Sequence, residues 1–302
     1  MIKQPSPSFI QSQGSCPTPS PSGRGALRRI FREFISWGEG VGIWLFRFVI
    51  CLVFVSWLLG FYAFANAKAY DGVWFMGFNL KHDLFKDVSV RQAVMHCLDR
   101  NFIATTIMSA EVIPGSFIPP GMLGYDPSLK PYKFNPKFAK TLMKRAKLPT
   151  SDQRLKKIKL LHTDGLKTIA IAQAIKDDLK NIGMKVELIQ ISYRDQNRWV
   201  EELSSGANDL YLMGYKADIE QLFTSEAGVA EADCTKLIEP LFKSNGEANF
   251  SGYVNADIDS LLDQLATLGP GLSSERETKL KEINKILYKD LPAVVLFYIE
   301  KL

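Results

Sequence analysis

Residues that build metal sites and disulfide scaffolds are scarce in this sequence. The chain of 302 residues contains three histidines, His82, His96 and His162, and no two of them stand at metal-ligand spacing on one predicted element. Four cysteines are too few to hold a fold of this length together by disulfides. We therefore expect neither a metal site nor a bound cofactor.

Sequence signals of catalysis are also missing. The chain has no Gly-rich phosphate loop, no nucleophile elbow, and no Ser, His and Asp in an order with supporting context. Asp257, Asp259 and Asp263 fall on a predicted helix whose leucines face inward, so we interpret them as a solvated face. The sequence predicts a protein that is not an enzyme.

The surplus of positive charge belongs to the first part of the chain. The formal net charge is +5, and residues 1–69 hold seven basic residues against two acidic ones. The residues from 70 onward contain 30 basic and 30 acidic side chains. Because a surface that follows a phosphate backbone needs an excess of Lys and Arg, this balance predicts no nucleic-acid partner.

Two cysteines, Cys97 and Cys234, fall in the part of the chain that is expected to fold. They can form a disulfide if this part lies in an oxidising compartment. Their predicted helical and loop contexts fit two independent thiols equally well. Both alternatives stay open at the level of sequence.

The first forty residues contain two kinds of segment. Residues 1–25 are rich in Pro, Ser and Gly, and they predict a disordered N-terminus because they cannot bury enough apolar area. Residues 26–40 place apolar side chains at helical spacing opposite arginines, and this pattern predicts an amphipathic helix in the membrane interface. The apolar side chains are Leu27, Ile30, Phe31, Phe34 and Ile35.

Residues 41–67 form a long apolar run. It contains one charge, Arg47, near its start, and no charged residue from Phe48 to Ala65. With residues 41–46 added and the Arg47 side chain reaching to the interface, the run is long enough to cross a bilayer. Small residues after it also fit the cleavage site of a signal segment. The length of the chain before the run, and of the run itself, favours a retained transmembrane helix.

The position of the basic residues predicts the orientation of this segment. Five of the seven basic residues in residues 1–69 precede it, so the N-terminus is expected in the cytoplasm and residues 70–302 outside, in the periplasm or its equivalent. We expect a single-pass protein of the cytoplasmic (inner) membrane, with membrane lipid as the partner of residues 26–67.

From Gly72 onward, stretches with a period of two alternate with stretches near 3.6, which predicts an α/β domain. Strands are expected at residues 72–80, 156–163, 184–192, 208–216 and 292–299. Helices are expected at residues 87–108, 136–148, 165–183, 195–206, 256–268 and 273–291.

The order of phrases in this domain is similar to that of a known family. The phrases include DVSVRQAVMHCLDR, PPGMLGYDP, KPYKFNPKFAKTLMKRA, IAQAIKDDLKNIGMKVEL, NDLYLMGYKAD and ILYKDLPAVVLFY. Together they resemble the family-5 extracellular solute-binding proteins, the oligopeptide-, dipeptide- and nickel-binding components of ABC importers. The resemblance implies a periplasmic-binding-protein-like (type II) fold, and residues 70–302 correspond to its second, C-terminal lobe alone.

The resemblance also implies three ligand-binding residues. In the stretch YLMGYKADIEQLF, Tyr215 matches a stacking aromatic residue and Asp218 an acid that meets a ligand's ammonium group. The Asp-Pro pair that usually follows this acid is missing here. Asn79 matches a position at the edge of the cleft. The alternatives are that Tyr215 packs in the core, that Asp218 caps a helix and that Asn79 is a turn residue at a strand end.

Two functions follow from these expectations. The first is a membrane-tethered, extracytoplasmic domain that binds a peptide-type solute and is linked to ABC transport. The second is a repurposed structural or interaction subunit of a larger membrane protein complex. The second function would use the former inter-lobe face, which is expected to expose apolar and aromatic side chains.

Overall fold

The computed structural model describes residues 69–217, 223–224, 230–269 and 271–301. Residues 68–302 form one compact unit. The predictions for residues 1–25, 26–40 and 41–67 therefore lie outside the described residues. Within the described ranges, no helix is long and apolar enough to cross a membrane.

The centre of the unit is a mixed five-stranded sheet with the strand order β4-β3-β5-β1-β8. The strands β3, β4 and β5 run parallel, while β1 runs antiparallel to both β5 and β8. Three short strands form a second sheet, in the order β2-β7-β6. The bounds are β1 Tyr70–Phe78, β2 Met122–Leu123, β3 Ile158–Thr163, β4 Val186–Ile191, β5 Leu210–Lys216, β6 Phe223–Thr224, β7 Ala230–Asp233 and β8 Ala293–Glu300.

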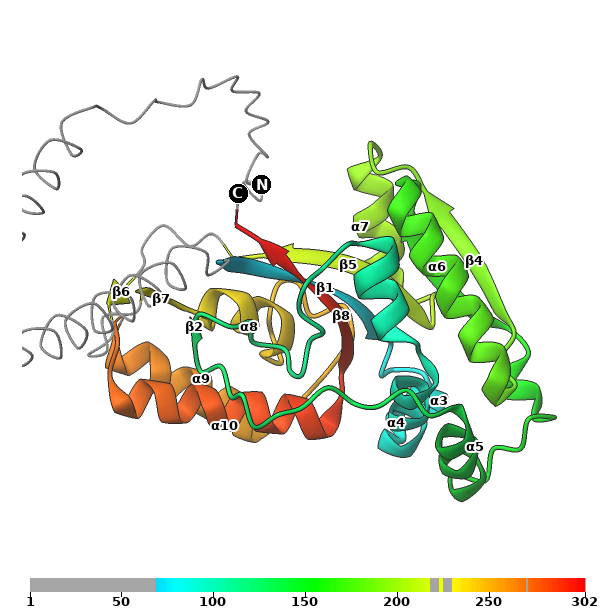
Figure 1. Ribbon diagram of the computed structural model, residues 1–302, viewed down its shortest axis with the longest axis horizontal. Helices are drawn as coiled ribbons and strands as arrows, with labels where there is room; N and C mark the ends of the chain where they lie inside the picture. The colour runs from blue at the N-terminus through cyan, green and yellow to red at the C-terminus, as the bar shows by residue number, and fades with distance from the viewer. Residues whose placement is uncertain (1–68, 218–222, 225–229, 270, 302) are drawn as a thin grey trace, which may run out of the picture. The chain divides into compact units, whose positions relative to one another are not determined.

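Helices cover both faces of the large sheet, and α9 and α10 lie side by side (Figure 1). The α-helices are α3 Asp83–Lys86, α4 Val88–Cys97, α5 Pro136–Arg145, α6 Leu166–Leu179, α7 Gln196–Ser205, α8 Thr235–Phe242, α9 Ala256–Leu268 and α10 Ser274–Asp290. The shorter or wider helices are η1 Phe102–Ile107, η2 Gln153–Leu155 and η3 Lys180–Ile182.

The alternation of side chains along the strands builds two apolar cores. In β1, Met76 and Phe78 join the core beneath α4, α5 and α6, while Val73 and Phe75 join the core beneath α8, α9 and α10. This is the two-sided burial expected of a sheet that helices cover on both faces. The α/β prediction for the domain is confirmed.

Local signals account for most of the helix starts. Asp87 accepts a hydrogen bond from the backbone N–H of Ser89 at the start of α4, and Asn135 accepts one from Phe138 at the start of α5. The α5 helix continues with Pro136 in its first turn, where the missing N–H costs no helical bond. Gly183 ends the η3 turn with a φ of 87°, in the left-handed region that favours glycine.

The single helix predicted for residues 87–108 is wrong. The α4 helix ends at Cys97, and a π-helical segment, η1, starts at Phe102. Between them, the carboxylate of Asp99 accepts a hydrogen bond from the backbone N–H of Phe102, and the backbone N–H of Asp99 donates to Asp178. Apolar periodicity continues through this break, so it did not reveal the competing cap.

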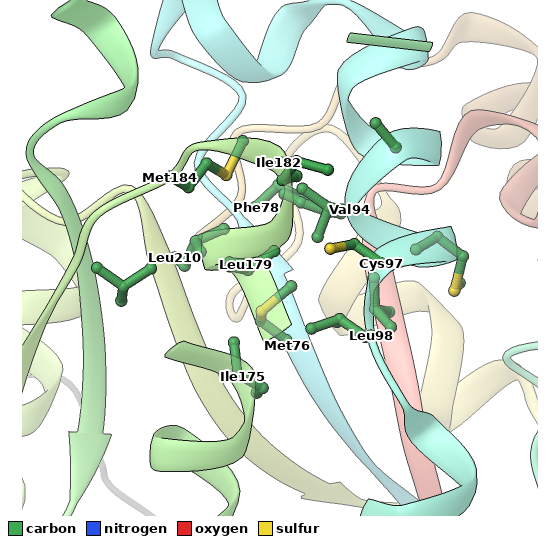
Figure 2. Close-up of a cluster of buried hydrophobic side chains, with 14 of the residues drawn as sticks. Met76, Phe78, Val94, Cys97, Leu98, Ile175, Leu179, Ile182, Met184 and Leu210 are labelled. Atoms are coloured by element: carbon green, nitrogen blue, oxygen red, sulfur yellow. The ribbon is translucent and has the colours of Figure 1, made fainter. Parts of the chain in front are cut away.

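The two cysteines do not form a disulfide, so the alternative of independent thiols is confirmed. Cys97 belongs to the core beneath α4 and Cys234 to the core on the other face of the sheet. Figure 2 shows the sulfur of Cys97 among apolar side chains that include Leu98 and Leu179. Burial raises the pKa of the Cys97 thiol to about 12 and raises that of Cys234 as well.

Both thiols are therefore expected to resist alkylation in the folded protein, because the thiolate is the reactive form and neither sulfur is exposed. Iodoacetamide at pH 8 should leave residues 68–302 unmodified, and it should label both cysteines after denaturation. A Thr141→Cys variant, which places a thiol on an exposed position of α5, supplies the positive control. Mass spectrometry measures the extent of labelling at each cysteine. If Cys97 or Cys234 is alkylated as fast as the thiol introduced by Thr141→Cys, the two native thiols are not buried.

Candidate ligand-binding edge

Three strand ends meet at one edge of the large sheet. Because β3, β4 and β5 are parallel, their last residues lie together, and the antiparallel pairing of β1 with β5 adds the start of β1. We call this set the carboxyl edge; it comprises residues 70–71, 163–166, 191–194 and 215–217. Open α/β sheets bind ligands beyond the carboxyl ends of their parallel strands. The fold therefore predicts a ligand site at the carboxyl edge.

Asp164 ties two loops of the carboxyl edge together. Its backbone N–H donates to the carbonyl of Ile191 over 3.1 Å, and its Oδ1 accepts from the backbone N–H of Tyr193 over 2.8 Å. The bond from Tyr193 holds the pKa of the Asp164 carboxyl below its ordinary value. The loop after β3 and the loop after β4 are thus fixed next to each other.

Two apolar side chains on these joined loops face solvent. Leu166, the first residue of α6, is 88% exposed, and Tyr193 is 53% exposed. The guanidinium of Arg194 lies 5.6 Å from the centre of the Tyr193 ring, and its Nε donates to the Tyr193 hydroxyl. A cation over an aromatic face orients the ring. The arrangement offers apolar contact beside a positive charge.

On the neighbouring strands, the edge carries charges of both signs. Lys216 Nζ lies 3.0 Å from Asp71 Oδ2, and the backbone N–H of Ala217 donates to the Asp71 carbonyl. The second oxygen, Asp71 Oδ1, is buried and has no hydrogen-bond partner among the described residues. An unsatisfied buried oxygen is costly, so a bound water, ion or ligand group at this position would relieve that cost.

Of the three residues that the sequence suggested, one lies at this edge. Tyr215 is half-buried near the end of β5 and packs against the core on the α8–α10 side. Asp218 lies outside the described residues. Part of the Tyr215 side chain is therefore held by the core, and part of it is accessible at the carboxyl edge.

Asn79 lies at the opposite edge of the sheet. In the β1–β5 pairing, Tyr215 faces Val73, whereas the backbone N–H of Asn79 donates to the Asp209 carbonyl, beyond the start of β5. Six residues of extended strand separate the two levels, which is about 20 Å. Asn79 and Tyr215 therefore do not contact one small ligand.

The side chain of Asn79 is engaged with the backbone. It is buried, its Nδ2 donates to the carbonyls of Gly206 and Asn208 over 2.9 Å each, and its Oδ1 accepts from the backbone N–H of Lys81. These are the bonds that a turn residue at a strand end makes. They join the end of β1 to the turn between α7 and β5.

Comparison with known proteins assigns the chain to a family. The family model for bacterial extracellular solute-binding proteins, family 5 (middle region), matches residues 60–224, which is more than half of the chain. The chain belongs to the family-5 extracellular solute-binding proteins. The family consists of binding proteins, in agreement with the prediction that the chain is not an enzyme.

Two curated family members show how far the likeness extends. The oligopeptide-binding protein OppA of Bacillus subtilis is 25% identical over 235 residues, which cover 75% of this chain and 40% of OppA. The di/tripeptide-binding protein 2 of Pseudomonas aeruginosa is 26% identical over 219 residues, covering 71% of this chain and 38% of that protein. The chain thus spans about two fifths of the length of these relatives.

Solved structures share the fold. DppA from Helicobacter pylori in complex with the peptide STSA superposes with a TM-score of 0.63 at 22% identity, covering 77% of this chain and 43% of that one. HbpA2 from Haemophilus parasuis gives the same TM-score at 20% identity. The family-5 lobe fold that the sequence predicted is confirmed.

Sequence reasoning missed the other residues of the edge. Asp71, Asp164, Leu166 and Tyr193 each lie within three residues of the end of a strand that the sequence did predict. The rule that ligands bind at the carboxyl ends of parallel strands could have pointed to the last three of them. Among the described residues, no three His, Cys, Asp or Glu side chains are placed to hold a metal ion.

One pocket, partly open to solvent, is too small for a peptide-type ligand. It has a volume of about 20 Å³ and lies beside Arg100, Ser116 and Tyr132. A space of this size accommodates about one water molecule. A peptide-type ligand does not fit into this pocket.

Proposed function

We propose that this family-5 protein binds a peptide-type solute at the carboxyl edge, outside the cytoplasm, in the service of an ABC importer. The observation that carries the proposal is the pair of exposed apolar side chains, Leu166 and Tyr193, held together by Asp164 at the end of the parallel strands. The names of the relatives support the solute class, since they include oligopeptide- and di/tripeptide-binding proteins.

The chemistry of the edge suits a peptide. Leu166 and Tyr193 offer apolar contact to side chains, and the exposed ammonium of Lys216 and the guanidinium of Arg194 offer partners for carbonyl and carboxylate oxygens. Small-ligand sites bury about 70–90% of their ligand. One edge supplies one wall of such a site, so we infer that a second wall covers the other side of the ligand.

Calorimetry of residues 68–302 against a mixture of tripeptides and tetrapeptides tests the binding. We expect saturable heat, and we expect the double variant Leu166→Ser, Tyr193→Ser to weaken binding by about tenfold or more, which is about 1.4 kcal/mol. The matched control is Val254→Ser, because Val254 is 73% exposed and lies outside the carboxyl edge. Absence of heat at high peptide concentration would contradict solute binding and favour the interaction subunit.

We further propose that residues 41–67 tether the protein to the cytoplasmic membrane as a single transmembrane helix. The support is the apolar run, which has one charge, Arg47, near its start and no charged residue from Phe48 to Ala65, with basic residues before it. The intact mass of the protein isolated from membranes tests this proposal. A mass that includes residue 1 is expected, and a mature chain that begins near residue 68 would show a cleaved signal segment instead.

A further inference from the structure

The equal totals of acidic and basic residues conceal a separation of charge. Residues 130–159 contain eleven basic residues and one acid, Asp152. The other residues from 70 to 302 contain 19 basic and 29 acidic side chains. The folded unit therefore has one strongly positive segment and a negative remainder. The net charge of the domain does not show this separation, because it sums the charges of all residues.

The centre of the positive segment is the outward face of α5. Ala139, Leu142 and Met143 are the buried residues of this helix, and they belong to the core beneath α4. The basic side chains lie on the other side of the helix and on its flanks, and all are exposed. We define the basic face as Lys133, Lys137, Lys140, Lys144, Arg145 and Lys147.

Most of these charges gain little from the fold, and only Lys144 and Arg145, in the last turn of α5, lie where the helix dipole favours a cation. Within the described part of the chain, no member of the basic face forms an ion pair with an acidic side chain, and Asp152 is paired with Arg154 at 2.9 Å. Lys137 lies three residues before Lys140, which lies four before Lys144, so like charges are neighbours on the helix. Lys137 also occupies the first turn, where the helix dipole disfavours a cation.

Two aromatic side chains are exposed beside the lysines. Phe134 is 46% exposed and Phe138 is 39% exposed. The ring of Phe138 meets the ring of His96 edge to face at a centroid distance of 4.9 Å, and His96 Nδ1 lies 2.8 Å from the carbonyl oxygen of Lys133. The aromatic rings and the ammonium groups thus share one small area held on α4 and α5.

This area is remote from the carboxyl edge. The α5 helix packs against α4 and against η3, which precedes the start of β4. In Figure 1, α5 lies at the far end of the folded unit from the start of β1. A partner on the basic face and a ligand at the carboxyl edge can therefore be bound at the same time.

We propose that the basic face, with Phe134 and Phe138, docks on an anionic lipid surface. Lysine outnumbers arginine five to one on this face, and ammonium groups act as point charges that suit a diffuse array of headgroups. Protein interfaces, by contrast, are depleted in lysine. Exposed phenylalanines beside lysines are the combination found in segments that lie in a membrane interface. An anionic surface attracts α5 and repels the negatively charged remainder of the unit, so the unit approaches with α5 facing that surface.

Co-sedimentation of residues 68–302 with vesicles tests this proposal. We expect binding to equimolar phosphatidylcholine and phosphatidylglycerol, weakening with added salt, and little binding to phosphatidylcholine alone. The variant Lys137→Glu, Lys140→Glu, Lys144→Glu should bind the anionic vesicles at least about tenfold more weakly than the unmodified protein does. The control is Lys281→Glu, Lys285→Glu, Lys289→Glu, which makes the same change in net charge on α10 and also breaks the ion pairs of Lys281 with Glu277 and of Lys285 with Asp126.

A second variant distinguishes lipid from other polyanions. Phe134→Ser with Phe138→Ser should weaken binding to anionic vesicles while leaving the net charge unchanged. Circular dichroism with thermal unfolding confirms that each variant is folded. The proposal is overturned if the unmodified protein does not bind anionic vesicles, if the α5 and α10 variants lose binding equally, or if the phenylalanine variant binds normally. Tighter binding to duplex DNA or to polyglutamate than to vesicles would also overturn it.

Discussion

Replacing Arg276 by alanine is expected to lower the free energy of unfolding by about 3–5 kcal/mol, because it removes one partner of a buried ion pair. Arg276 is 5% exposed, and its guanidinium lies 2.5 Å from Asp233 Oδ2. It also donates to the hydroxyl of Thr235 and to the carbonyls of Leu265 and Gly269. One side chain on α10 thus joins the end of β7, the start of α8 and the end of α9.

Urea unfolding of residues 68–302, followed by circular dichroism, measures this loss. The matched control is Lys281→Ala, which removes an exposed ion pair with Glu277 on the same helix. Exposed pairs contribute about 0–1 kcal/mol, so the control should unfold nearly as the unmodified protein does. A loss below about 1 kcal/mol for Arg276→Ala would show that the pair does not hold these elements together.

Replacing Asn79 by alanine is expected to lower the free energy of unfolding by about 2–3 kcal/mol and to leave peptide affinity unchanged. The stability falls because the carbonyls of Gly206 and Asn208 and the N–H of Lys81 lose their bonds to the side chain. Affinity stays because Asn79 lies at the edge opposite the proposed ligand site.

Urea unfolding and peptide calorimetry on the same variant separate the two roles that the sequence left open for Asn79. Asn101→Ala is the matched control, because Asn101 is exposed and its side chain makes no capping bond at the start of η1. A stable Asn79→Ala variant with lost affinity would assign Asn79 to the ligand. An unstable variant with normal affinity is the expected result.

Long periodic segments explain why much of the fold could be predicted. The apolar positions of α6, α9 and α10 recur at helical spacing, and the strands β3, β5 and β8 are bounded by turn or cap residues. The α8 helix escaped prediction because it has eight residues and contains Pro240, which normally interrupts a helix. The strands β2, β6 and β7 are too short to leave a pattern.

The candidate site was harder to predict than the fold. Family resemblance suggested Tyr215 and Asn79 together, but only strand pairing shows that they lie at opposite edges. The link between Asp164 and Tyr193 joins residues 29 apart in sequence, so no local pattern contains it. The basic face was visible in the composition of residues 130–159, but the net charge of the whole domain concealed it.

Hydrogen exchange, measured by mass spectrometry on residues 68–302 with and without saturating peptide, tests the central claim most directly. If a peptide-type solute binds at the carboxyl edge, amide exchange should slow in residues 163–166, 191–194 and 215–217 and stay unchanged around Asn79 and in α5. Protection centred on the opposite edge of the sheet, or no protection at any peptide concentration, would contradict the assignment of the ligand site.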